Sequence, residues 1–168
     1  MEDINKIANN IFVMSEDCVY HVLEKFEKDQ LLDKAMTYAF VKAFFIHTVK
    51  LALAGNDKLE KFDAIYESYK RDFIEYYKLN NSKIDQELLN SIEESFKGFF
   101  DISESMMIEN LEDGYEYRHH IIDTFEIFRK ILEKKSKTNI RQDLFENSIT
   151  EIRNVSEKIC EYILEEVK

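Results

Sequence analysis

The chain has 168 residues, enough for a single domain with a hydrophobic core that needs no covalent cross-links. It contains no proline and three glycines, so it lacks the residues that form the turns of a β-rich fold. Its formal net charge of −11 argues against a phosphate-binding surface, and therefore against a nucleic acid partner, and favours solubility or a basic protein partner.

The first predicted helix covers residues 3–28. Its apolar residues recur at spacings of three and four, which places them on one face of the helix: Ile4, Ile7, Ile11, Met14, Cys18, Val22 and Phe26. No glycine or proline separates this helix from the next one. We therefore place the break near Asp29, in a short polar cluster whose aspartate can cap a helix N-terminus.

The second predicted helix, residues 35–54, is the central element because 15 of its 20 residues are apolar. Its five polar residues scatter around the helix axis, which predicts that other helices cover it on most sides. We expect Gly55 to take the left-handed position at the end of this helix, and Asp57 and Glu60 to form a capping box for the next one.

A helix this apolar could also span a membrane, but Lys42, His47 and Lys50 leave no uncharged run near the roughly 18 residues that crossing requires. The first ten residues are polar, whereas a signal peptide needs an apolar run. The sequence therefore predicts a cytoplasmic protein without membrane insertion. Cys18 and Cys160 show no CxxC spacing, and we interpret both as buried free thiols.

The third predicted helix, residues 58–79, carries an aromatic stripe at spacings of three and four: Leu59, Phe62, Tyr66, Tyr69, Phe73 and Tyr76. Two interpretations stay open. The rings could pack against the central helix as ordinary core, or they could leave an apolar cavity, because flat rings fill irregular space less completely than aliphatic chains.

Two shorter helices are predicted next, from about Ser82 to Gly98 and from about Asp101 to Gly114, with Gly98 interrupting them. Two long antiparallel helices, residues 115–135 and 140–167, then close the chain. The apolar faces of this last pair are wide, which would suit either a thick core or a partner helix.

Motifs of catalysis and phosphate binding are absent from the sequence, which has no glycine-rich loop, no HExxH and no recognisable nucleophile setting. One dense polar cluster, Glu112, Glu116, His119, His120 and Asp123, could ligate a metal, since Glu116 and His119 have the spacing used in di-iron bundles. The chain has no second such motif, so we interpret these residues as solvated side chains and predict no metal, cofactor or catalytic residue.

The order of the predicted helices resembles the haem-less globin-like sensor domains of spore-forming bacteria, which include sensors of sporulation kinases, their free-standing inhibitory relatives and stressosome N-terminal domains. A haem globin would need a proximal histidine within residues 83–112, and none occurs there. The expected fold is therefore an all-α single domain over residues 1–168, a globin-like bundle of six to seven helices without haem.

The resemblance implies an apolar pocket for a fatty-acid-like ligand. A buried ligand carboxylate would need a cation or donor, which Lys42, His47 or Lys50 could supply, although the lysines could also extend to solvent and the histidine could be a core residue. The candidate ligand-binding residues are Phe40, Lys42, Phe44, His47, Lys50, Tyr66, Tyr69 and Phe73.

The resemblance also implies a homodimer through the last two helices and a non-enzymatic role, in which the protein inhibits sporulation signalling by competing with a sensor histidine kinase for its ligand or its partner. The alternative is an acidic helical inhibitor or immunity-type protein that binds a basic partner through surface charge. A third reading, a metal-carboxylate enzyme that uses Glu116, ranks below these two.

Overall fold

The computed structural model describes residues 3–29, 34–80 and 142–167, together with positions 86–87, 89–90, 93–94, 96–98, 101, 126, 129–130 and 133. Its described elements are α1 (Ile4–Asp29), α2 (Lys34–Ala54), the short 3-10 helix η1 (Leu59–Lys61), α3 (Phe62–Asn80) and α6 (Gln142–Glu166). No strand occurs among these residues, which confirms the predicted all-α class. The globin-like arrangement and the number of helices stay predictions.

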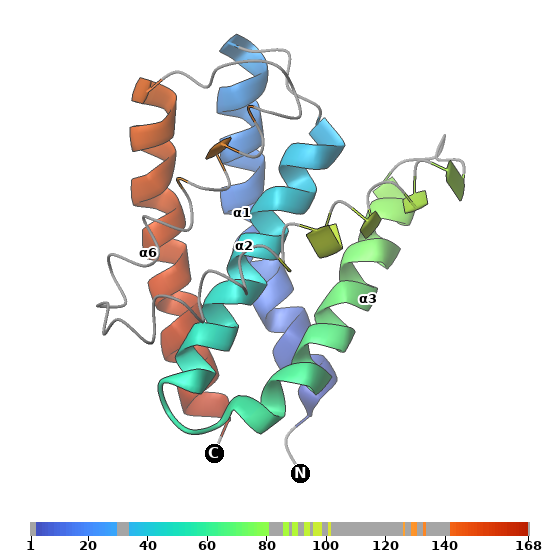
Figure 1. The fold of residues 1–168 in the computed structure, drawn as a ribbon, viewed down its shortest axis with the longest axis vertical. Helices are drawn as coiled ribbons and strands as arrows, with labels where there is room; N and C mark the ends of the chain where they lie inside the picture. Colours follow the sequence, from blue (N-terminus) through green and yellow to red (C-terminus); the bar gives the residue numbers. More distant parts are fainter. Residues whose placement is uncertain are drawn as a thin grey trace.

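The centre of the bundle is formed by α1 and α2, each of which contacts both α3 and α6. Figure 1 shows α6 and α3 on opposite sides of α2, with α1 behind. Successive helices α1, α2 and α3 run in alternating directions, and α6 runs antiparallel to α1. Within the described part, α3 and α6 do not touch each other, so α1 and α2 separate the two outer helices.

The prediction of a buried central helix is confirmed, because every residue from 41 to 49 of α2 is buried, including the polar Lys42, His47 and Thr48. The segment Thr37–Ala54 is long and apolar enough to cross a bilayer by length and composition, and 88% of it lies buried inside the fold. Core helices of this kind share their composition with membrane spans. Covered by α1, α3 and α6, α2 is a core element of this bundle.

The helix boundaries follow the sequence closely. The break near Asp29 is confirmed, since α1 ends at that residue and α2 begins at Lys34.

A hydrogen bond joins the C-terminal end of α6 to the turn after α2. Lys58 Nζ donates to the carbonyl oxygen of Val167 at 2.5 Å. This contact holds the end of α6 against the turn between α2 and α3.

The turn after α2 differs from the prediction. The left-handed residue is Asp57, with φ of 56°, and not Gly55. The N–H of Lys58 donates to the carbonyl oxygen of Leu53 at 3.0 Å, which is the long hydrogen bond of a Schellman motif, and a short polar Asp tolerates its left-handed position. The predicted capping box was also wrong, because the residue that precedes η1 is Lys58, without a side-chain cap.

The apolar face of α6 turns inward. Its buried residues Ile152, Ile159 and Ile163 belong to the same core cluster as residues of α1 and α2. The described outward positions are polar: Asn147, Thr150, Asn154, Lys158, Glu161 and Glu165. The predicted dimer through the last two helices stays a prediction, and α6 would contribute mainly polar side chains to it.

Most of the predicted helices 82–98, 101–114 and 115–135 lies outside the described residues. The positions that are described there are helical, including Gly98, the predicted interruption. The cluster of Glu112, Glu116, His119, His120 and Asp123 also falls outside them. Among the residues that the structure does describe, no group of three or more His, Cys, Asp or Glu could hold a metal ion.

Candidate functional site

The residues predicted to bind a ligand separate into a buried set and a half-buried set. Lys42, Phe44, His47, Tyr69 and Phe73 are buried in the core. By contrast, Lys50 and Tyr66 line an open groove at the surface. Phe40 belongs to α2, but its side chain lies outside the described part. The described members therefore do not surround one common cavity.

The ammonium of Lys42 is fully buried and already has partners on α1. Its Nζ donates to the carbonyl oxygen of Phe12 at 2.8 Å and to Ser15 Oγ at 2.6 Å, and it forms an ion pair with the carboxylate of Glu16. It also lies 3.6 Å from the centroid of the Phe12 ring, within the range of a cation–π interaction. A ligand carboxylate at this position would have to displace Glu16.

Phenol groups from two helices surround this buried pair. Tyr38 of α2 donates to Glu16 Oε1 at 2.9 Å, and Tyr69 of α3 donates to the carbonyl oxygen of Lys42 at 3.1 Å. Burial lowers the pKa of Lys42 from 10.5 to about 8, although the neighbouring Glu16 acts in the opposite direction. Burial also raises the pKa of Tyr38. The arrangement therefore couples α1, α2 and α3 through polar contacts inside the core.

The aromatic stripe of α3 is mostly core. The rings of Phe73 and Phe96 stack with centroids 4.6 Å apart, and Tyr69 stacks on Phe96 at 6.4 Å. On α2, Phe44 packs edge-to-face against Phe45 at 5.9 Å. These contacts agree with the core-packing interpretation of the aromatic residues.

Both predicted thiols are free and buried, as the sequence indicated. Burial raises the pKa of Cys18 to about 12, which keeps its thiol protonated and weakly nucleophilic. His47 is also fully buried, and its role as an anchor for a ligand carboxylate stays a prediction.

The groove, of about 390 Å³, lies between α3 and the described residues that follow it. A stack of rings underlies the groove, since Phe62 and Tyr66 have centroids 5.8 Å apart and Tyr66 and Phe96 are 6.5 Å apart. Phe62 is 2% exposed and Phe96 is fully buried, so Tyr66 is the half-buried ring of this stack. Lys50 Nζ lies 5.2 Å from the centroid of Phe62. The full lining consists of Lys50, Phe62, Asp63, Tyr66, Glu67, Lys70, Lys97 and Asp101.

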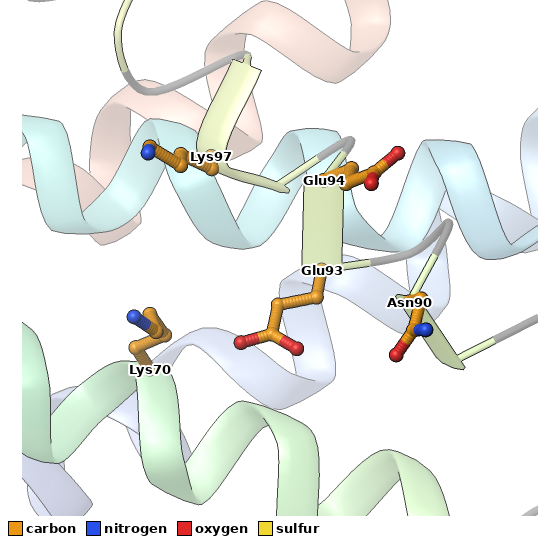
Figure 2. A pocket seen from close by; sticks show the side chains of 5 residues that line it. All are labelled: Lys70, Asn90, Glu93, Glu94 and Lys97. Carbon is orange, nitrogen blue, oxygen red and sulfur yellow. The ribbon is translucent and has the colours of Figure 1, made fainter. Parts of the chain in front are cut away.

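A second hollow, of about 360 Å³, adjoins the groove and shares Lys70 and Lys97 with it. Figure 2 shows its lining, in which Lys70 rises from α3 and the other side chains come from residues 90–97. The side chain of Glu93 extends toward α3, whereas Glu94 points the other way. Together the two hollows combine aromatic rings, three lysines and several carboxylates.

The sequence predicted Lys50 and Tyr66 as ligand residues, but it did not predict the other charged residues that line the groove: Asp63, Glu67, Lys70, Lys97 and Asp101. Asp63, Glu67 and Lys70 lie at spacings of four and three, which places them together on the solvent side of α3. That pattern is typical of any solvated helix face. Only the position of Lys97, which belongs to another segment, shows that these charges border a hollow.

No protein-family model, curated protein or solved structure matches this chain. The fold and the site therefore define the protein only by class, as an all-helical domain with a buried central helix and an open groove of mixed charge.

Proposed function

We propose that this chain is a non-enzymatic regulatory domain that binds an amphipathic acid, of the fatty-acid type, in the groove beside Lys50. The observation that carries the proposal is that Lys50 and Tyr66, two of the predicted ligand residues, line the same groove. That groove also contains two further lysines, Lys70 and Lys97, beside the stacked rings of Phe62 and Tyr66.

The chemistry of the groove suits such a ligand. An apolar chain lying on the half-buried ring of Tyr66 would bury apolar area, while Lys50, beside the ring of Phe62, would offer a cation to the carboxylate. The volume of about 390 Å³ falls within the range of small-molecule sites. The core lysine is a poorer anchor, because Lys42 already pairs with Glu16.

The regulatory part of the proposal rests on the resemblance in helix order. In this proposal the domain is cytoplasmic and inhibits sporulation signalling by sequestering the ligand of a sensor histidine kinase or by occupying its dimer face. A homodimer through the last two helices belongs to this proposal.

The test is native mass spectrometry of freshly purified protein, followed by titration of dodecanoate against a displaceable fluorescent fatty acid. A fatty-acid-sized adduct and saturable displacement support the proposal. Lys50→Met and Tyr66→Ala should each weaken dodecanoate binding about tenfold, which corresponds to about 1.4 kcal/mol. Lys78→Met, at the exposed end of α3, is the control and should bind as the wild type does.

If the purified protein carries no adduct and binds no dodecanoate, the fatty-acid ligand is rejected. That result would favour the second candidate function, an acidic inhibitor of a basic protein. The net charge of −11 supports that candidate, as does α6, whose seven acidic and two basic residues leave it strongly negative. Binding through such a surface would weaken steeply with added salt, because the Debye length falls from about 10 Å at 0.1 M to about 3 Å at 1 M.

A further inference from the structure

The hollow next to the aromatic groove has a balanced set of charges. Its lining contains two lysines, Lys70 and Lys97, and two glutamates, Glu93 and Glu94, with Asn90 as the remaining member. The four charges come from two separate segments, since Lys70 belongs to α3 and the other three follow it in the chain. A site of this kind favours neither a simple anion nor a simple cation.

The positions of these side chains place opposite charges on both sides of the hollow. Figure 2 shows Glu93 extending toward the helix from which Lys70 rises. Lys70 Nζ lies 3.7 Å from Glu67 Oε2 on the same helix, a loose pair in which both groups remain partly exposed. Because an ammonium has three donors, Lys70 can keep this contact and still bind an incoming carboxylate.

The glutamates restrict the charge of the ligands that the hollow can bind. A ligand carboxylate that reaches Lys70 or Lys97 also approaches Glu93, and the repulsion between like charges offsets part of the attraction. A ligand that carries an ammonium close to its carboxylate satisfies both kinds of group. Its carboxylate meets the lysines, and its ammonium meets the glutamate.

We infer that the ligand of the groove carries a zwitterionic head group, an ammonium and a carboxylate within a few atoms of each other, on an apolar chain. A simple fatty acid places its carboxylate at Lys50, whereas the zwitterionic head group occupies the adjoining hollow of Lys70, Glu93 and Lys97. In both cases the chain lies on the half-buried ring of Tyr66. This inference rests on the proposed function, since it specifies which amphipathic acid the groove binds. Alkylated or acylated amino acids that retain a free amine are the chemical class.

The experiment compares three probes with the same twelve-carbon chain, each below its critical micelle concentration: dodecanoate, dodecylamine and N-dodecylglycine. Displacement of the fluorescent fatty acid gives the affinity of each probe. N-dodecylglycine should bind at least tenfold more tightly than dodecanoate, and dodecylamine should bind most weakly. The full-length protein is used throughout.

Substitution of Glu93 separates the head-group contact from the binding of the chain. Glu93→Gln should weaken N-dodecylglycine about tenfold and should leave dodecanoate unchanged or slightly tighter, because it removes a negative charge from the hollow. The matched control is Glu87→Gln, an exposed helical position on the same segment that does not line the hollow. It should leave the affinities of all three probes as they are.

The outcomes distinguish this inference from the proposed function. If dodecanoate binds as tightly as N-dodecylglycine, or if Glu93→Gln weakens both equally, the zwitterionic head group is rejected and the fatty-acid site survives. If none of the three probes binds, the proposed function fails and this inference fails with it. Tightest binding of dodecylamine would reject both, because it would show that the groove selects a cation.

Discussion

Two lysines of the same helix, Lys42 and Lys50, occupy opposite kinds of environment. Lys42 is fully enclosed and pairs with Glu16 of α1, whereas Lys50 lies at the edge of a groove, over the ring of Phe62. They are eight residues apart on α2, and both were predicted to anchor a ligand carboxylate. The comparison shows that the packing of neighbouring helices decides whether a lysine in an apolar helix is enclosed in an ion pair or lies at a surface groove.

The largest expected effect on stability comes from removing one partner of the ion pair between Lys42 and Glu16. Glu16→Gln removes the carboxylate and leaves the ammonium of Lys42 buried without its counter-ion, which should lower the free energy of unfolding by about 3 kcal/mol. Denaturant unfolding measures the change. The control is Asp17→Asn, an exposed neighbour on the same helix, which should change stability by less than about 0.5 kcal/mol. Equal effects of the two variants would contradict a specific role for the pair.

The buried lysine should also make stability depend on pH. The pKa of Lys42 is about 8 in the folded chain and near 10.5 when exposed, so between these values the unfolded chain binds more protons. The free energy of unfolding therefore rises with pH, by about 1 kcal/mol from pH 8 to 9 and about 3 kcal/mol over the whole range.

Cys18 opposes this trend, because its pKa is raised from 9.0 to about 12 and folding then disfavours the thiolate as pH rises above 9. The measurement is therefore the difference between wild type and Lys42→Met, in which most of the contribution of Cys18 cancels, because burial dominates its pKa shift and Lys42 has the smallest effect on it. The wild type should gain about 1 kcal/mol relative to the variant from pH 8 to 9. If the free energies of unfolding of the two proteins change in parallel with pH, then Lys42 titrates as an exposed lysine does.

A smaller effect tests the hydrogen bond that supports the pair. Tyr38→Phe removes the donor that lies 2.9 Å from Glu16 Oε1 but keeps the ring, which stacks against Phe73. The expected loss is about 1 kcal/mol in the free energy of unfolding. A loss as large as that of Glu16→Gln would mean that the phenol, and not the ion pair, dominates this part of the core.

The smallest effect on stability is expected at the groove. Lys50→Met removes a cation–π contact at a partly exposed position and should cost about 0.5 kcal/mol, although it should weaken ligand binding about tenfold. Thermal unfolding and dodecanoate titration of the same preparation measure the two effects. A loss of stability above about 2 kcal/mol would place Lys50 with Lys42 as a structural residue.

The parts of the fold that depend on local pattern could be predicted from the sequence. The burial of α2 followed from its composition, and the end of α1 at Asp29 followed from a polar cluster alone. The predicted position of the left-handed residue after α2 was wrong by two residues. The hydrogen bond from the N–H of Lys58 to the carbonyl oxygen of Leu53 closes the turn with Asp57, and not Gly55, in the left-handed conformation. Helix propensity does not specify which residue closes such a turn.

The site depended on contacts between distant segments, and these could not be predicted. Glu16 is 26 residues from Lys42, and nothing in the spacing of α1 indicates which of its residues faces that lysine. The groove likewise needs Lys97 and Asp101 beside α3. The relative placement of helices determines both, and periodicity within each helix carries no information about it.

The lack of contact between α3 and α6 within the described part has a consequence for how substitutions combine. Because these two outer helices do not contact each other, the effects on stability of changes at their outward-facing positions should add. Substitutions in α1 or α2 should instead be non-additive with changes on either side. Among the described helices, α1 and α2 are the ones that could relay an effect of groove occupancy to the outer surface of α6. The polar contacts that join α1 to α2 are then the first place to interrupt it.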